Sequence, residues 1–243
     1  MIYLDYQATT PLAPEARDAM LRWLDGPGGT GFGNPHSAHR MGRQAKAAVE
    51  LARDQVAALF PAGGKTVFTS GATEALNLAI RGSGRVGTVS YSAIEHSAVG
   101  DTAQAAGPSH VLNVAKDGQC NTRQDVPDDT RLICVMQVNN EIGTIQPIGE
   151  MAKRAKDTGA LLLVDGVQAA GKMALPREAD MIAVSAHKLH GPKGIGALWV
   201  RDGLSLIPHV EGGGQEQGLR SGTLSPALCA GFGAAAALAV ERQ

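Results

Sequence analysis

Short apolar runs alternate with amphipathic stretches along the whole chain, a pattern that predicts strands separated by helices. The runs 132–136 and 161–164 are apolar at every position. Continuous apolarity is typical of strands that are buried on both faces of a parallel sheet. Strands are expected at 67–69, 88–90, 132–138, 161–164, 181–184 and 197–200. We therefore predict an α/β fold in which helices flank a mostly parallel mixed sheet.

Helices are expected between and after these strands, at 38–60, 73–81, 97–106, 148–158 and 225–241. In the longest of them, residues such as Met41, Ala45, Ala48 and Ala52 recur every three or four positions and form one apolar stripe. The last helix is rich in alanine and reaches almost to Gln243. A chain that stops in a strong helix suggests a domain boundary or a truncation, so we expect one domain of a longer fold.

The composition is that of an ordinary globular protein, with 44% hydrophobic and 19% charged residues. A net charge of −1 gives no electrostatic reason to expect nucleic acid or an anionic membrane as a partner. No apolar run approaches the ~20 residues needed to span a bilayer. The N-terminus lacks the basic and then apolar order of a signal peptide, so the cytoplasm is the expected location. The three cysteines are too widely spaced for a disulfide framework or a CxxC metal site.

Polar residues follow several of the expected strands, at the sheet edge where ligands bind in open α/β folds. The stretch 69–74 passes through Gly71 into a helix, and small residues with free N–H groups at a helix start suit a phosphate group. The alternative is an ordinary helix start that is capped by Thr73. Asp165 follows the apolar strand 161–164, where an unpaired buried carboxylate would be costly. A pyridinium nitrogen is a suitable partner for it, and a cap on the following helix is the alternative.

Lys188 stands just past another apolar strand, between Ser185-Ala186-His187 and a Gly-Pro turn. This position suits an amine that bonds covalently to a cofactor, because such amines work where their surroundings lower the pKa. The alternative is a solvated surface lysine, which is what we expect of Lys193 in the same turn. No serine lies in a GxSxG motif, and the histidines do not group with carboxylates at metal-ligand spacing. Neither a serine hydrolase nor a metal site is therefore predicted.

Two further polar groups, His96 and the run 139–143, follow strands at the same edge. Together with the other segments they resemble the cysteine desulfurase family, pyridoxal-phosphate enzymes of aminotransferase class V and fold type I. The matching stretches occur in family order along the whole chain and are residues 3–11, 33–37, 69–74, 95–96, 138–143, 164–165, 185–188, 191–196 and 218–223. The resemblance implies an aspartate-aminotransferase-like large domain at 16–243, with residues 1–15 on the side of a small domain.

The resemblance implies roles for five residues around the cofactor ring. Lys188 would bond covalently to pyridoxal 5′-phosphate, and His96 would stack on the ring and take part in proton transfer. Asp165 would pair with the pyridine nitrogen, and Gln168 would reach the ring hydroxyl. Asn140 would lie beside the cofactor and the substrate. Lys188 and His96 are thus the catalytic residues that the resemblance implies.

The resemblance also implies a phosphate site that two subunits share. Ala72, Thr73, Ser185 and His187 resemble the contacts that the phosphate makes within one chain. Thr223 resembles a ligand that the family supplies to the phosphate of the neighbouring subunit. A homodimer is therefore the expected state.

The activity that the resemblance implies is the removal of sulfur from L-cysteine. The reaction would yield alanine and a persulfide on the enzyme, which in the family feeds iron–sulfur cluster or thio-cofactor synthesis. A sulfur-acceptor or scaffold protein is an expected partner. Another class V reaction, selenocysteine lysis or amino transfer, is the alternative.

The chain also departs from the family pattern. Members of the family are around half as long again, and the part without a counterpart here is mostly a small C-terminal domain. That domain carries the cysteine that accepts sulfur and an arginine that binds the substrate carboxylate. Cys134 is expected in a strand, Cys229 in the last helix and Cys120 in a loop, and none stands at the place of the family's cysteine. We therefore expect a chain that binds the cofactor but is close to inactive alone.

Overall fold

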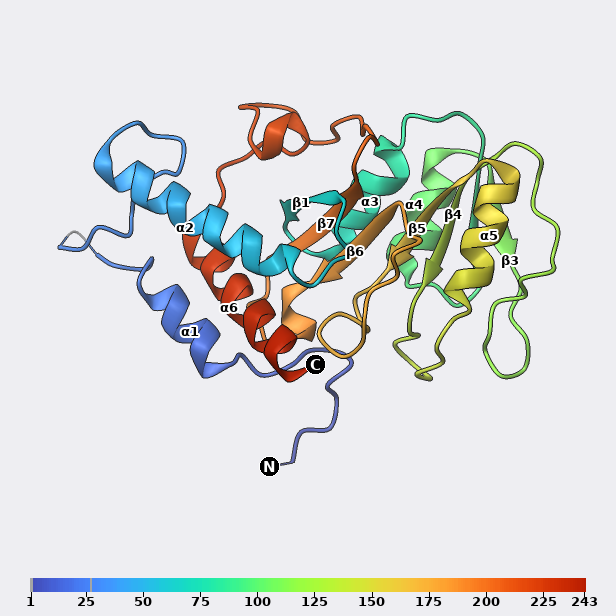
Figure 1. Ribbon diagram of the computed structural model, residues 1–243, viewed down its shortest axis with the longest axis horizontal. Helices are drawn as coiled ribbons and strands as arrows, with labels where there is room; N and C mark the ends of the chain where they lie inside the picture. The colour runs from blue at the N-terminus through green and yellow to red at the C-terminus, as the bar shows by residue number, and fades with distance from the viewer. Residues whose placement is uncertain (1, 27) are drawn as a thin grey trace.

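The computed structural model describes residues 2–26 and 28–243, which form a sheet between two layers of helices (Figure 1). The sheet has seven strands in the order β1-β7-β6-β5-β4-β2-β3 among the described residues. The strands are β1 (Gly64–Thr69), β2 (Thr88–Ser92), β3 (Ser109–Leu112), β4 (Thr130–Met136), β5 (Leu161–Asp165), β6 (Met181–Ser185) and β7 (Gly196–Arg201). β7 runs antiparallel to both of its neighbours, and the other pairs are parallel. The prediction of a mostly parallel mixed sheet is confirmed.

The helices cover both faces of this sheet and are α1 (Pro14–Leu21), α2 (Arg40–Ala57), α3 (Ala72–Gly82), α4 (Ser97–Ala106), α5 (Ile148–Thr158) and α6 (Pro226–Arg242). α1, α2, α5 and α6 share one core with the sheet, and α3 and α4 share the other. Along β4, Ile133 and Val135 face the first core, whereas Leu132 and Cys134 face the second. Burial on both faces explains why the sequence of this strand is apolar throughout. Within the described residues, none of the helices combines the length and the apolar surface that a membrane crossing requires.

Most of the predicted helices are confirmed, and those at 97–106 and 148–158 are confirmed to the residue. The predicted helix 38–60 begins and ends inside its expected bounds. Its start is set by His39, whose Nδ1 accepts a hydrogen bond from Gly42 N–H at 3.2 Å. Capping of this kind depends on single side chains, so an apolar stripe alone does not reveal where a helix begins.

The apolar pattern predicts neither α1 nor β3. Ala16 is the one buried residue of α1, so this helix lacks an apolar stripe. β3 lies at the edge of the sheet and buries only Leu112, so its sequence does not resemble a core strand. The predicted strand 132–138 is too long, because β4 ends at Met136 and Val138 forms an isolated bridge in the following loop.

α6 packs closely on α1 and α2 through two glycines. A β-carbon on Gly231 would lie 2.5 Å from the side chain of Met20. A β-carbon on Gly233 would lie 2.8 Å from the Cα atom of Ala52. The small residues of α6 therefore allow three helices to meet on one face of the sheet.

Candidate active site

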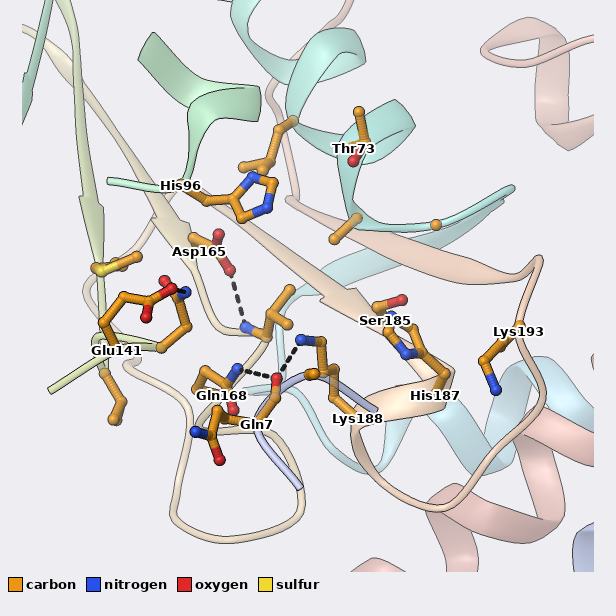
Figure 2. Close-up of a pocket in the computed structure, with 18 of the residues that line it drawn as sticks. Gln7, Thr73, His96, Glu141, Asp165, Gln168, Ser185, His187, Lys188 and Lys193 are labelled. Carbon is orange, nitrogen blue, oxygen red and sulfur yellow. Dashed lines mark hydrogen bonds between the residues drawn. The ribbon is translucent and has the colours of Figure 1, made fainter. Parts of the chain in front are cut away.

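The parallel strands β1, β2, β4, β5 and β6 end along one edge of the sheet, around a pocket of about 540 Å³ (Figure 2). Nine of the ten residues predicted to bind the cofactor line this pocket: Ala72, Thr73, His96, Asn140, Asp165, Gln168, Ser185, His187 and Lys188. The tenth, Thr223, is exposed and does not line it. Segments that are far apart in the sequence thus meet where an α/β fold places its ligands.

We name the part of the pocket around residues 70–73 its phosphate end. It is formed by the start of α3. Gly71 is the N-cap of this helix, and no side chain caps it. The N–H groups of the first turn therefore lack partners within the helix, and the positive end of the helix dipole lies at the pocket. Thr73 is already inside the helix, so the alternative in which Thr73 is the cap is wrong.

Ser185 and His187 complete the phosphate end from the end of β6. The Ser185 hydroxyl lies 4.0 Å from the place that a β-carbon on Gly71 would take. A β-carbon on Gly196 would lie 2.8 Å from the Cα atom of Gly71, so only glycine lets β7 approach the helix start so closely. Main-chain N–H groups, a hydroxyl and an imidazole form a donor set that fits a phosphate group.

Lys188 follows β6 in a short 3₁₀ turn, Ala186–Lys188. Its Nζ donates a hydrogen bond to the main-chain oxygen of Gln7. Burial lowers the pKa of Lys188, and nearby carboxylates, Asp165 first among them, oppose that shift. A lowered pKa leaves a larger fraction of neutral amine, which is the form that attacks a carbonyl carbon.

Two other lysines lie near Lys188. Lys193 is exposed, as predicted for a solvated surface lysine, and it is also among the residues that line the pocket. Lys172 donates a hydrogen bond to the main-chain oxygen of Gln168 at 3.2 Å and does not line the pocket. Lys188 is the lysine that Figure 2 shows between Asp165 and the phosphate end.

Asp165 ends β5 and is 6% exposed. Its Oδ1 accepts a hydrogen bond from Val167 N–H at 2.9 Å, so it also holds the following turn. Burial raises the pKa of Asp165, whereas the Val167 hydrogen bond and the charges of His96 and Lys188 lower it. Among the described residues, no ion pair includes this carboxylate. A protonated ring nitrogen would supply the positive charge that a buried carboxylate requires.

His96 is the N-cap of α4 and also faces the pocket beside Asp165 (Figure 2). Its Nδ1 accepts a hydrogen bond from Ala98 N–H at 3.1 Å. In the neutral ring this bond places the proton on Nε2. The residue therefore has a structural role at one nitrogen and leaves the other available to a ligand.

The segment 7–10 contributes Gln7 and Ala8 to the lining of the pocket, although the sequence predicts no role for them. The main-chain oxygen of Gln7 accepts a hydrogen bond from the Gln168 side chain at 2.9 Å. Thr10 donates from both its N–H and its hydroxyl to the main-chain oxygen of His187, each at 2.9 Å. The signal that marks this segment is its match to the family pattern, since it has neither periodicity nor a catalytic residue type.

Glu95 also has no role assigned to it by the sequence. Its Oε1 accepts a hydrogen bond from Met136 N–H at 2.7 Å, and its Oε2 is buried without a hydrogen-bond partner in the part of the chain that the structure describes. Burial first, and the charge of Asp165 second, raise the pKa of Glu95 well above its usual range. The raised pKa favours the neutral carboxylic acid at Glu95, which does not itself line the pocket but precedes His96 in the chain. We name the part of the pocket around Asp165 and His96 the ring end.

The three cysteines are free and buried. Cys134 lies in β4 and Cys229 in α6, as predicted, and Cys120 lies in a loop. Burial raises the pKa of Cys120 to about 11 and that of Cys229 to about 12, and raises that of Cys134 well above its usual value. None of them lines the pocket. The described residues also hold no cluster of side chains that fits a metal ion.

The comparisons with known proteins agree on one family. The family model for aminotransferase class V matches residues 2–242. The chain is 42% identical to the mitosomal cysteine desulfurase of Trachipleistophora hominis, over 99% of this chain and 58% of that protein. The chain therefore spans less than two thirds of the length of that relative.

Solved structures give the same result. An X-ray structure of a NifS-like protein from Rickettsia africae ESF-5 is similar with a TM-score of 0.91 and 32% identity, over 100% of this chain and 69% of that one. A structure of SspA in complex with cysteine is similar with a TM-score of 0.86 and 35% identity, over 99% of this chain and 72% of that one.

Proposed function

The chain belongs to the cysteine desulfurase family of aminotransferase class V, whose members are pyridoxal-phosphate enzymes, and we propose that it binds this cofactor and acts on L-cysteine. The observation that carries the proposal is the convergence of an uncapped helix start, Lys188 and Asp165 on one pocket. The proposed reaction removes sulfur from L-cysteine and leaves alanine. The similar structure that contains cysteine supports this choice of substrate.

The pocket has a group for each part of the cofactor. The N–H groups of Ala72 and Thr73, with the side chains of Ser185 and His187, would hold the phosphate. Asp165 would face the pyridine nitrogen, Gln168 the ring hydroxyl, and His96 the face of the ring. When bound, the cofactor supplies an electron-withdrawing ring that the side chains of a protein lack.

Residues of this chain would transfer protons and stabilise charge during the reaction. The lowered pKa of Lys188 favours the neutral amine, which accepts a proton at Nζ and returns it. The hydrogen bond from Ala98 holds the ring of His96, so a proton can leave or reach this ring only at Nε2. The Asp165 carboxylate stabilises a positive charge placed beside it, and the raised pKa of Glu95 favours its neutral form, which adds no second negative charge there.

We further propose that none of the three cysteines accepts the sulfur. A sulfur acceptor must be an exposed thiolate, whereas all three thiols are buried and have raised pKa values. The 243-residue chain should therefore bind the cofactor and L-cysteine yet release sulfide slowly by itself.

A homodimer and a sulfur-acceptor protein complete the proposal. Thr223 is exposed and does not line the pocket of its own chain, which leaves it available to the phosphate end of a second copy. A thiolate of the acceptor or scaffold protein would attack the sulfur of L-cysteine, so that the Cβ–S bond breaks, alanine remains and the sulfur leaves as a persulfide of that protein, for iron–sulfur cluster or thio-cofactor synthesis.

The test is reconstitution of the purified chain with pyridoxal 5′-phosphate. Binding should give visible absorbance, and borohydride should fix the cofactor to the protein. The loaded chain should then exchange the Cα proton of L-cysteine with deuterium, measured by NMR, because this step needs no sulfur acceptor. Faster reaction with selenocysteine than with cysteine, or transfer of the amino group to an oxo acid, would favour the alternative class V reactions. A chain that binds no cofactor would overturn the proposal.

A further inference from the structure

The start of α3 carries a carboxylate beside the place where the proposed phosphate would bind. Glu74 lies in the first turn, and its Oε2 accepts a hydrogen bond from Ser70 N–H at 2.7 Å. The carboxylate thus reaches back over the helix start, much as in a capping box, and accepts a hydrogen bond from the N–H group of Ser70, which lies outside the helix. It fixes the backbone of 70–73 but places a negative charge beside an anion site, where the charge would repel a phosphate dianion.

Arg220 is the group that balances this charge. Its Nε donates to Glu74 Oε1 at 2.7 Å and its Nη2 to Glu74 Oε2 at 3.4 Å. Each of the two side chains is 20% exposed, so water screens the pair only in part. Burial would raise the pKa of Glu74, but hydrogen bonds from Arg220 and Ser70 outweigh it and hold that pKa below its usual value. Glu74 is therefore ionised, and its charge is paired.

The loop that carries Arg220 is fixed to the same strand that leads into the helix start. Glu216 has a side chain that is 2% exposed and accepts hydrogen bonds from Arg53 at 2.7 Å on each oxygen. It also accepts one from Phe68 N–H, in β1, at 2.6 Å. Glu216 and Gln217 have φ values of 49° and 58°, in the left-handed region that is strained for residues other than glycine. Such a conformation persists where surrounding contacts hold it, so the loop presents Arg220 in a defined place.

We propose that Arg220 is a positioning residue for the cofactor phosphate, because it neutralises the carboxylate that shapes the start of α3. Arg220 does not line the pocket, so it acts through Glu74. Because Arg220 neutralises Glu74, the carboxylate can fix the start of α3 without repelling a dianion that binds there. The inference rests on the proposed function, since the dianion is the phosphate of pyridoxal 5′-phosphate.

The experiment measures the binding of two probes, inorganic phosphate and pyridoxal 5′-phosphate, to the wild-type chain and to R220Q, E74Q and the double variant. R220Q should bind both probes about tenfold more weakly, because an unpaired negative charge remains in the first turn. Glutamine at 74 keeps an oxygen for Ser70 N–H, so the double variant should regain the wild-type affinity to within about threefold. Pyridoxal, which has no phosphate, should bind equally to all four proteins.

The matched control is R81Q, which removes the same charge from the last turn of α3, far from the helix start. It should bind both probes like the wild type. A double variant as weak as R220Q would overturn the inference, because Arg220 would then contact the phosphate directly or merely hold the loop. Equal binding by R220Q and the wild type would also overturn it and leave the proposed function intact. A wild-type chain that binds neither probe would overturn both proposals.

Discussion

At the phosphate end of the pocket, no side chain caps the first turn of α3 among the described residues, and Arg220 already neutralises the nearby carboxylate of Glu74. At the ring end, the carboxyl groups of Asp165 and Glu95 are buried, and burial raises both of their pKa values. No ion pair among the described side chains offsets either of them. The phosphate end is thus balanced before a ligand binds, whereas the ring end requires a positive charge from one.

The difference assigns a separate task to each end. A site of fixed dipoles and paired charges holds an anion without changing its own protonation. Buried titratable groups instead change their protonation with their surroundings, and such groups concentrate where chemistry takes place. Changes at the phosphate end should therefore alter affinity, and changes at the ring end should alter reactivity.

Lys188→Ala should give the largest effect, because Lys188 lies between the two ends. Without its amine, the chain should hold pyridoxal 5′-phosphate only by non-covalent contacts. Borohydride should then fix no cofactor to the protein, and Cα-proton exchange should fall below detection. Lys172→Ala and Lys193→Ala are the matched controls, and both should keep the covalent bond. A reducible bond that survives in Lys188→Ala would show that another lysine carries the cofactor.

Asp165→Asn should separate the two ends. An amide cannot neutralise a protonated ring nitrogen, so the rate of Cα-proton exchange should fall by about a hundredfold or more, the range in which acid–base groups contribute. The affinity for inorganic phosphate should stay at the wild-type value, because the phosphate end is untouched. NMR exchange rates and phosphate titrations on the same preparation provide the two readouts. Loss of both in parallel would mean that the ends are not independent.

Ser185→Ala should have the opposite effect to Asp165→Asn, lowering affinity rather than the exchange rate, and the change should be smaller. Loss of one hydroxyl that donates to a charged group costs about 1.5–3 kcal/mol, so phosphate and cofactor should bind at least about tenfold more weakly. Once the chain is saturated with cofactor, the exchange rate should stay within about threefold of the wild type.

Thr223→Ala tests the proposed dimer, since it should weaken the binding of pyridoxal 5′-phosphate only under conditions in which light scattering shows a dimer.

The ring end was the more predictable of the two from sequence. Asp165 and Lys188 directly follow apolar strands, and parallel strands bring their ends to one edge, so periodicity and fold class place these residues together. Glu95 had no such signal, because its importance comes from burial against Met136 rather than from its place in the chain.

The balance of charge at the phosphate end could not be predicted. Arg220 and Glu74 are 146 positions apart, and Arg53 and Glu216 are 163 apart. No local pattern links charges at such separations, because only the packing of the loop onto β1 brings them together. α1 is missed for a different reason, because it buries a single residue and so has no apolar stripe, whereas the apolar pattern locates α4 and α5 to the residue.

Glu95→Gln should change least, and its effect should appear in how stability depends on pH. The pKa of Glu95 in the folded chain is raised well above 4.5 by burial and by Asp165. Between the unfolded and the folded pKa values, the folded chain therefore holds this proton while the unfolded chain has lost it. In that window the free energy of unfolding falls as pH rises, by up to about 1.4 kcal/mol per pH unit, and it levels off above the folded pKa.

Glutamine is neutral at every pH, so Glu95→Gln should lack this decline and be the more stable protein at neutral pH. Urea unfolding of both proteins from about pH 4.5 to about pH 8 measures the difference. Asp165, whose pKa is also raised, contributes a decline of the same sign in both proteins, so subtracting one curve from the other leaves the decline that Glu95 adds, including its coupling to Asp165. The exchange rate should change little, because a neutral amide replaces a neutral acid. Curves that stay parallel over the whole range would mean that Glu95 is ionised in the fold, and the contrast between the two ends would then rest on Asp165 alone.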